Sequence, residues 1–287
     1  LASKENPLTA RVMVNRVWGK LFGSSIVTSE NNFGATGKAP SHPELLDYLA
    51  VRFMDNNWSI KSLLRQLVLT RTYQTSSEFH PLAFKKDPEN TLQWRHNPKK
   101  IDAEALRDSM LMASGKLDLQ RPVGSEIAKH GDGRIGLPRS PRGISSSSDK
   151  PNYRSVYLPI ARDNLPEALT LFDPADPNLV TGKREETNVP DQALYLMNNP
   201  FVIEQAEAMA KRLIAEADTP LERFSKAFLL CYARPATNKE IEATKAFIHN
   251  FLVTAGTDSQ NRGKVNNLAF VSFCQSLLIS AEFRYLN

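Results

Sequence analysis

Helix-start signals recur along this 287-residue chain and limit what it can fold into. Residues 219–222 and 237–240 both match a capping box, in which Thr and Glu side chains close a helix's first turn. Between such starts, apolar residues follow the helical period, as over residues 60–68. Further starts are expected at Asn6-Pro7, Ser41 to Glu44, Ser59, Asp102, Pro190 and Asn199-Pro200. The sequence therefore predicts a mainly α fold, a multi-helix domain with long irregular loops.

The order of these signals predicts one helical domain over residues 1–287. Residues 1–115 form a helical half, 116–153 an irregular basic excursion, 154–190 a strand plus a polar loop, and 191–287 a second helical half. A small β element is expected at residues 155–160, where SVYLPI alternates in polarity. One strand needs a partner, which we expect near residues 135–137 or 26–27.

Several classes of protein fit the composition poorly. The apolar run over residues 268–283 is broken by serines and Gln275, and is too short to span a bilayer. Cys231 and Cys274 lie in apolar helical patterns outside any C-x-x-C motif, so two buried thiols are expected, with a single disulfide as the alternative. The chain starts at Leu1 and shows no signal peptide, which we interpret as a piece of a longer protein.

The stretch over residues 172–201 is the leading candidate for a functional surface. It carries five acidic residues and two Lys/Arg between prolines, although it joins two helices. Asp173, Asp176 and Asn178 could hold calcium through their oxygens, but Asx residues beside Pro174 and Pro177 are also what turns need. Turn formation is the favoured interpretation, and no metal is assigned to the chain.

Carboxylates beside arginines leave two functions open for this stretch. Paired carboxylates carry out acid–base hydrolysis in glycosidases, whereas arginine neighbours lower carboxylate pKa values and disfavour an acid catalyst. The candidate residues here are Arg162, Asp163, Asp173, Asp176, Arg184, Asp191 and Gln192. Ion pairing within the stretch is the favoured interpretation.

The first predicted helix adds three candidates to that surface. Arg11 and Asn15 share a face at i, i+4, and Arg16 lies beside it among apolar neighbours. We expect Arg11 or Arg16 to reach the acidic loop over residues 173–191. These three residues complete the candidate functional surface.

Most of the net charge of +5 sits in one loop. Residues 115–155 hold eight Lys/Arg against four Asp/Glu, with few aromatic residues among them. A solvated loop is favoured over a nucleic-acid contact, because single-strand binders interleave aromatic side chains with basic ones. The five histidines show no paired metal spacing, and no nucleophile-elbow, phosphate-loop or dinucleotide motif is present.

Six sequence blocks in order carry a resemblance to a known family. They are NPLTARVMVNRVWGKLFG, NNFGATGKAPSHPELLDYLA, NNWSIKSLLRQLVLTRTYQ, IDAEALRDSMLMASGKLD, RSVYLPIARDN and FDPADPN…REETNVPDQALYLMNNPF. Together they resemble a planctomycete domain family of unknown function, the C-terminal module of large exported proteins. Such modules lie downstream of planctomycete-type cytochrome c domains.

The resemblance implies an extracytoplasmic setting and a multidomain parent. Any haem would belong to a neighbouring domain, and no cofactor is expected in this chain. Two functions follow: a docking or binding module for neighbouring domains, a cell-envelope partner or a carbohydrate, or alternatively a hydrolase of a polysaccharide or ester using carboxylates of residues 162–191. An exported location disfavours a nucleic-acid partner.

Overall fold

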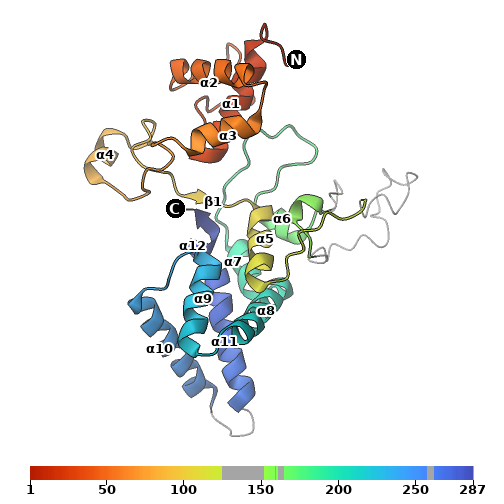
Figure 1. The fold of residues 1–287 in the computed structure, drawn as a ribbon, viewed down its shortest axis with the longest axis vertical. Helices are drawn as coiled ribbons and strands as arrows, with labels where there is room; N and C mark the ends of the chain where they lie inside the picture. Colours follow the sequence, from red (N-terminus) through yellow and green to blue (C-terminus); the bar gives the residue numbers. More distant parts are fainter. Residues whose placement is uncertain (125–151, 159, 161–164, 257–261, 287) are drawn as a thin grey trace. The chain divides into compact units, whose positions relative to one another are not determined.

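The chain forms two compact units. A computed structural model describes residues 1–124, 152–158, 160, 165–256 and 262–286. Unit 1 comprises Leu1–Lys99, Leu179–Arg184 and the C-terminal Leu286, and unit 2 comprises the described residues of Lys100–Asn178 and Glu185–Tyr285 (Figure 1). Helices dominate both units, as the sequence predicts. No helix among the described residues is both long enough and apolar enough to cross a membrane.

Unit 1 is built on three packed helices and a short fourth. These are α1 (Pro7–Phe22), α2 (Pro43–Asp55), α3 (Ile60–Val68) and α4 (Pro81–Lys86). Two helix starts lie where the sequence predicts them: Pro7 opens α1 and Ser59 caps α3. Gly23 ends α1 in the left-handed conformation. The apolar stripes of α1, α2 and α3 form one core that includes Val14, Phe22, Leu49 and Leu67.

The predicted capping box at Ser41 is displaced by one residue. His42 is the N-cap of α2 and makes no side-chain cap bond. The Ser41 hydroxyl instead donates to the Ile26 carbonyl at 3.3 Å, and the Ser41 amide donates to the same oxygen at 2.9 Å. A long-range contact with the loop after α1 therefore replaces the local cap.

Asn15 fixes that loop from inside the core. The Asn15 side chain is fully buried on α1. Its Oδ1 accepts from the Val27 amide at 2.7 Å, and its Nδ2 donates to the Val27 carbonyl at 3.0 Å. Both backbone groups of Val27 are thereby satisfied away from water, which lets Ile26 and Val27 enter the core.

Unit 2 is a helical bundle around α8. Its helices are α5 (Ala103–Ser114), α6 (Glu167–Leu171), α7 (Pro190–Asn198), α8 (Pro200–Glu216), α9 (Pro220–Tyr232), α10 (Asn238–Ala255), α11 (Arg262–Leu278) and α12 (Ala281–Arg284). α8 packs against α5 on one side and α11 on another, and α11 also packs against α10 (Figure 1). The fully buried apolar residues of α8 are Val202, Ala206, Met209, Ala210 and Leu213. Both predicted capping boxes, at Thr219 and Thr237, are formed.

Two details differ from the sequence-based prediction. α5 was assigned to the N-terminal half, but its buried residues Leu106, Met110 and Leu111 belong to the core of unit 2. Residues 155–160 were expected to contain a strand, but Ser155–Tyr157 is a 3-10 turn. The β pairing nearby is a single bridge between Asp118 and Tyr153. The ladder fails to extend because Ser155 turns inward to bond with α5.

The small sheet of the structure lies elsewhere. β1 (Lys99–Lys100) pairs with β2 (Tyr285–Leu286). The expected partner segment over residues 135–137 and most of the expected basic excursion, residues 125–151, lie outside the described residues. The two cysteines are free thiols, and burial raises the pKa of Cys231 to about 12.

Replacing Asn15 by Leu is expected to lower the free energy of unfolding of unit 1 by about 2–4 kcal/mol, because Val27 would keep a buried donor and acceptor without partners. Trp18, Trp58 and Trp94, all the tryptophans of the chain, lie in Leu1–Lys99, so urea unfolding followed by tryptophan fluorescence reports on this unit alone. The control is Arg16→Ala at an exposed neighbour, expected to change stability by less than about 0.5 kcal/mol. Equal effects of the two substitutions would contradict this role.

Candidate functional site

The acidic stretch that the sequence singles out is organised by a lysine. Lys100 leads into α5, and its side chain is only 7% exposed. Its Nζ donates to Asp173 Oδ2 at 3.2 Å, to the Thr187 carbonyl at 2.5 Å and to Gln192 Oε1 at 3.0 Å. The ammonium group also lies 5.9 Å from the centre of the Phe172 ring. All three Nζ protons thus have acceptors.

Asp173 and Gln192 complete the same polar cluster. Asp173 Oδ1 accepts from the Thr187 hydroxyl at 2.6 Å, and Oδ2 accepts from the Thr187 amide at 2.9 Å. Gln192 is 1% exposed, and its Nε2 donates to the Leu171 carbonyl at 2.9 Å. Lys100, Asp173, Thr187 and Gln192, the Lys100 cluster, therefore tie the end of α6 to the start of α7.

The charge on Asp173 is stabilised by its surroundings. Burial opposes ionisation, but hydrogen bonds from the Thr187 side chain and backbone, followed by the contact with Lys100, outweigh it and lower the Asp173 pKa. An acid catalyst needs a pKa near the working pH, so Asp173 is unsuited to that role. Its φ of +57° shows that it also provides a left-handed turn after Phe172.

Two other acidic candidates of the loop, Asp176 and Asp191, stabilise a turn or lie exposed at a helix start. Asp176 Oδ1 accepts from the Asn178 amide at 2.7 Å, which is the turn that the Asx-Pro pattern favours. Asp191 is exposed in the first turn of α7, where a carboxylate suits the helix dipole. Among the described residues, no group of three or more His, Cys, Asp and Glu side chains could hold a metal ion.

The arginines and the remaining candidates are distributed differently from the prediction. Arg11 Nε donates to Asp47 Oδ1 of α2 at 2.6 Å, and each side chain shifts the pKa of the other away from neutrality. Arg16 is exposed on α1, and Arg184 is half-buried in unit 1. Arg162 and Asp163 lie outside the described residues. Of the eight candidates that lie among the described residues, Asp173 and Gln192 are joined in one cluster.

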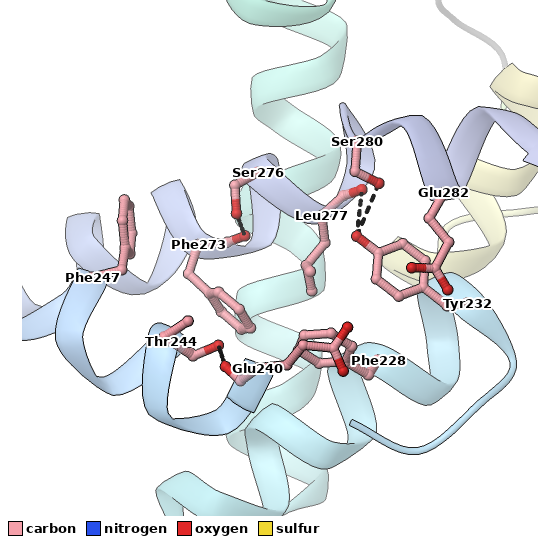
Figure 2. A pocket seen from close by; sticks show the side chains of 11 residues that line it. Phe228, Tyr232, Glu240, Thr244, Phe247, Phe273, Ser276, Leu277, Ser280 and Glu282 are labelled. Atoms are coloured by element: carbon pink, nitrogen blue, oxygen red, sulfur yellow. Dashed lines mark hydrogen bonds between the residues drawn. The ribbon is translucent and has the colours of Figure 1, made fainter. Parts of the chain in front are cut away.

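Sequence reasoning missed a groove in unit 2. It has a volume of about 350 Å³ and lies among α9, α10, α11 and α12 (Figure 2). Phe228, Phe273 and Leu277 form its apolar base, and the half-exposed Phe247 stands at its α10 side. Helical periodicity did place these aromatic residues on apolar faces, but it gave no sign that the faces leave an opening between them.

The polar groups that line the groove are bonded within the fold. The Tyr232 hydroxyl donates to Ser280 Oγ at 2.9 Å, Thr244 Oγ1 donates to the Glu240 carbonyl, and Ser276 Oγ donates to the Phe273 carbonyl (Figure 2). Burial is the main reason that the pKa of Tyr232 is raised to about 12, so its hydroxyl stays protonated. These groups shape the groove and supply few open catalytic functions.

An arginine holds the acidic rim of the groove together. Arg234 bonds Glu240 with Nη1 and Nη2 at 3.0 and 2.7 Å, and Glu282 with Nε and Nη2 at 2.6 and 2.7 Å. Its guanidinium also stacks near Phe228 and Tyr232. The Arg234 contacts, together with hydrogen bonds from Thr237, bring the pKa of Glu240 to about 2 against opposing desolvation. The rim therefore contains two carboxylates, those of Glu240 and Glu282, which bond the same guanidinium group.

A second buried charge lies where α5 meets the 3-10 turn. Arg107 is 2% exposed, and its Nη1 donates to the Tyr153 carbonyl and to Ser155 Oγ, both at 3.2 Å. Asp108 Oδ1 accepts from the amide and the hydroxyl of Ser155 at 2.7 and 2.6 Å. This arrangement holds the chain beside α5 and explains why residues 155–157 form a turn in place of a strand.

Comparison with known proteins gives one match. A family model described as PSD1, Protein of unknown function (DUF1553), matches residues 1–248. No curated protein and no solved structure matches the chain. The match ends inside α10, whereas unit 2 continues through α11 and α12, which complete the groove.

Replacing Lys100 by Met is expected to lower the free energy of unfolding of unit 2 by about 3 kcal/mol, because Asp173 would keep a buried charge without its cation. Urea unfolding followed by far-UV circular dichroism, with hydrogen exchange of residues 166–198, measures the loss. Lys211→Met at an exposed position on α8 is the matched control and should leave both readouts unchanged. Equal protection of residues 166–198 in both variants would rule out this role of Lys100.

Replacing Asp173 by Asn is expected to flatten the acid dependence of stability. The folded-state pKa of Asp173 is lowered, so its stabilisation is present above the unfolded value of about 3.9 and disappears as pH falls through the folded value. The wild-type chain should therefore lose more stability than Asp173→Asn as pH falls below about 4. Unfolding series at several pH values test this, and parallel curves would contradict it.

Proposed function

This chain belongs to the PSD1 family, whose function is unknown, and we propose that it is a docking module of a larger exported protein. The resemblance of its six blocks to planctomycete modules supports the extracytoplasmic setting. On the same resemblance, we expect the partners to be the neighbouring domains of the parent protein. One of these domains would be of cytochrome c type and would carry any haem.

The groove of unit 2 is the observation that carries this proposal. Its base is aromatic and aliphatic, and its polar lining groups already bond one another. Such a surface binds an apolar side chain by removing it from water, which needs no reactive group. We propose that an apolar anchor from a neighbouring domain occupies it.

The charge of the rim defines the anchor further. Glu240 and Glu282 share the one guanidinium of Arg234, which leaves one negative charge in excess at the rim. Because the contacts with Arg234 lower the pKa of Glu240 to about 2, the Glu240 carboxylate stays ionised at every physiological pH. The expected occupant is therefore an apolar side chain flanked by Lys or Arg on the partner domain.

The hydrolase alternative receives less support from the same residues. Asp173 and Glu240 both have pKa values lowered by their partners, which suits ion pairing and disfavours proton donation near neutral pH. Asp173 also has both oxygens occupied by Thr187 and Lys100. Catalysis by the Asp173 carboxylate would require its contacts with Thr187 and Lys100 to be broken first.

Replacing Ala243 by Trp is expected to block docking. Ala243 is exposed and lines the groove, so a larger side chain fills it without entering the core. The 287-residue chain should bind the separately produced remainder of the parent protein, and Ala243→Trp should weaken that binding by about tenfold or more, measured by isothermal titration calorimetry. Ala246→Trp adds the same side chain at an exposed position of α10 outside the groove lining, and should bind like the wild type.

Three outcomes would contradict the proposal. Equal binding by Ala243→Trp and Ala246→Trp would remove the groove from the interface. If the wild-type chain does not bind the remainder of the parent protein, the proposed occupant of the groove, an anchor from a neighbouring domain, is wrong. Saturable binding of a cell-envelope glycan that Ala243→Trp abolishes would replace the domain partner by a carbohydrate.

A further inference from the structure

The segment around α4 presents large apolar side chains to solvent in unit 1. No residue of α4 is buried, and none belongs to the core that α1, α2 and α3 form. Phe79, Leu82 and Leu92 are each more than half exposed, and Phe84 is 42% exposed. Single apolar residues are common on protein surfaces, whereas a contiguous group of them marks a binding surface.

Three aromatic rings of this segment are contiguous. The centre of the Phe79 ring lies 5.2 Å from that of Phe84 and 6.4 Å from that of Trp94. Phe79 precedes the N-cap residue of α4 and Phe84 lies one turn inside the helix, so their contact is a hydrophobic staple. The staple accounts for the two phenylalanines but not for Trp94, which joins them from the loop after α4. We call Phe79, Phe84, Trp94 and Arg95 the α4 patch.

Hydrogen bonds fix the loop that carries Trp94 and Arg95. The buried Asn90 accepts from the Arg95 amide at 3.3 Å and donates to the Arg95 carbonyl at 2.8 Å. Both carboxylate oxygens of Asp87 accept from amides of the same loop, and the Trp94 indole donates to the Asp87 carbonyl at 2.9 Å. The backbone of the patch is therefore ordered before any partner arrives, which lowers the entropic cost of binding.

Arg95 places a cation without an acceptor in the patch. Its guanidinium carbon lies 4.9 Å from the centre of the Trp94 ring and 5.7 Å from that of Phe79. Nε is buried without a hydrogen-bond partner, and neither Nη group bonds to any residue that the structure describes. An arginine stacked on aromatic rings keeps its N–H donors for a planar anion such as a carboxylate. The half-buried Arg95 thus offers a positioned positive charge.

From these contacts we propose that the α4 patch docks a segment of a partner protein in which Asp or Glu lies beside an aromatic or large aliphatic side chain. The carboxylate of the partner bonds the Nη groups of Arg95, and the apolar side chain packs on Phe79 and Phe84 and leaves water. Aromatic residues and arginine are the residue types that dominate binding at protein interfaces. The patch favours an acidic segment and the groove of unit 2 a basic one, so this inference does not rest on the groove.

The charge of the segment disfavours a membrane as the occupant. Residues 78–95 contain three Lys/Arg and three Asp/Glu, so their formal charges cancel. Surfaces that bind anionic membranes carry clusters of Lys and Arg in excess of acidic residues. The one positioned cation of Arg95 fits a single carboxylate of a protein segment better than a charged lipid surface.

Selection from a random phage-displayed peptide library tests the proposal, with the Ala243→Trp variant as the target so that the groove of unit 2 is filled. Enriched peptides are expected to carry Asp or Glu beside an aromatic or large aliphatic residue. A synthetic copy of the most enriched peptide then serves as the probe in isothermal titration calorimetry. Adding Arg95→Gln to the target should weaken its binding by about tenfold or more, because charge-assisted hydrogen bonds are lost.

A matched variant and a modified peptide serve as controls. Arg65→Gln, which removes an exposed guanidinium of α3 outside the patch, should leave the affinity unchanged. Replacing the acidic residue of the peptide by its amide should weaken binding as much as Arg95→Gln, and both changes together should cost no more than either alone. The modified peptide leaves the protein unaltered, so this comparison holds even where Arg95→Gln disturbs the fold.

The proposal is overturned if no peptide of this kind is enriched, if Arg95→Gln and Arg65→Gln bind the probe equally, or if the losses in the two-way comparison add. Self-association of the wild-type chain that Arg95→Gln abolishes, measured by sedimentation, would replace the partner protein by a second copy. Binding to phosphatidylglycerol vesicles that Arg95→Gln abolishes would replace it by a membrane.

Discussion

The buried ammonium group of Lys100 is the constraint around which the polar centre of unit 2 is arranged. A charge that is almost removed from water needs a full set of acceptors, and the chain supplies them from three places: Asp173 after α6, the Thr187 carbonyl and Gln192 at the start of α7. Phe172 and Leu171 are drawn into the same region by the ring contact and by the Gln192 amide. The polar loop is ordered because this charge must be satisfied.

The parts of the fold that depend on nearby residues could be predicted from the sequence. The capping boxes at Thr219 and Thr237 and the Ser59 cap all form where the pattern placed them. Each is decided within four residues, so the sequence contains the whole interaction. The displaced cap at Ser41 and the 3-10 turn at Ser155 depended on Ile26, Arg107 and Asp108, which are distant along the chain.

The same distinction explains the result for the candidate site. Asp173 and Gln192 were recognisable as unusual polar residues between core helices, and they do form one cluster. Their cation could not be found by inspection, because Lys100 lies 73 residues before Asp173 and looks like any solvated lysine. Arg11 likewise pairs with Asp47, 36 residues away on the helix it packs against. The groove arises from the spacing of four helices, which no single sequence pattern encodes.

The division of the chain between its two units has a consequence for how the protein is made. The backbone passes from one unit to the other at residues 99–100, 178–179, 184–185 and 285–286. Unit 1 includes residues 179–184, where Asn31 Nδ2 donates to the Val180 carbonyl and the Asn31 side chain lies close against Gly182. A ribosome adding about 5–20 residues per second therefore releases the first helices well before the segments that complete their unit. The N-terminal helices therefore either complete their folding only after residues 179–184 have been synthesised, or fold first and bind this segment later.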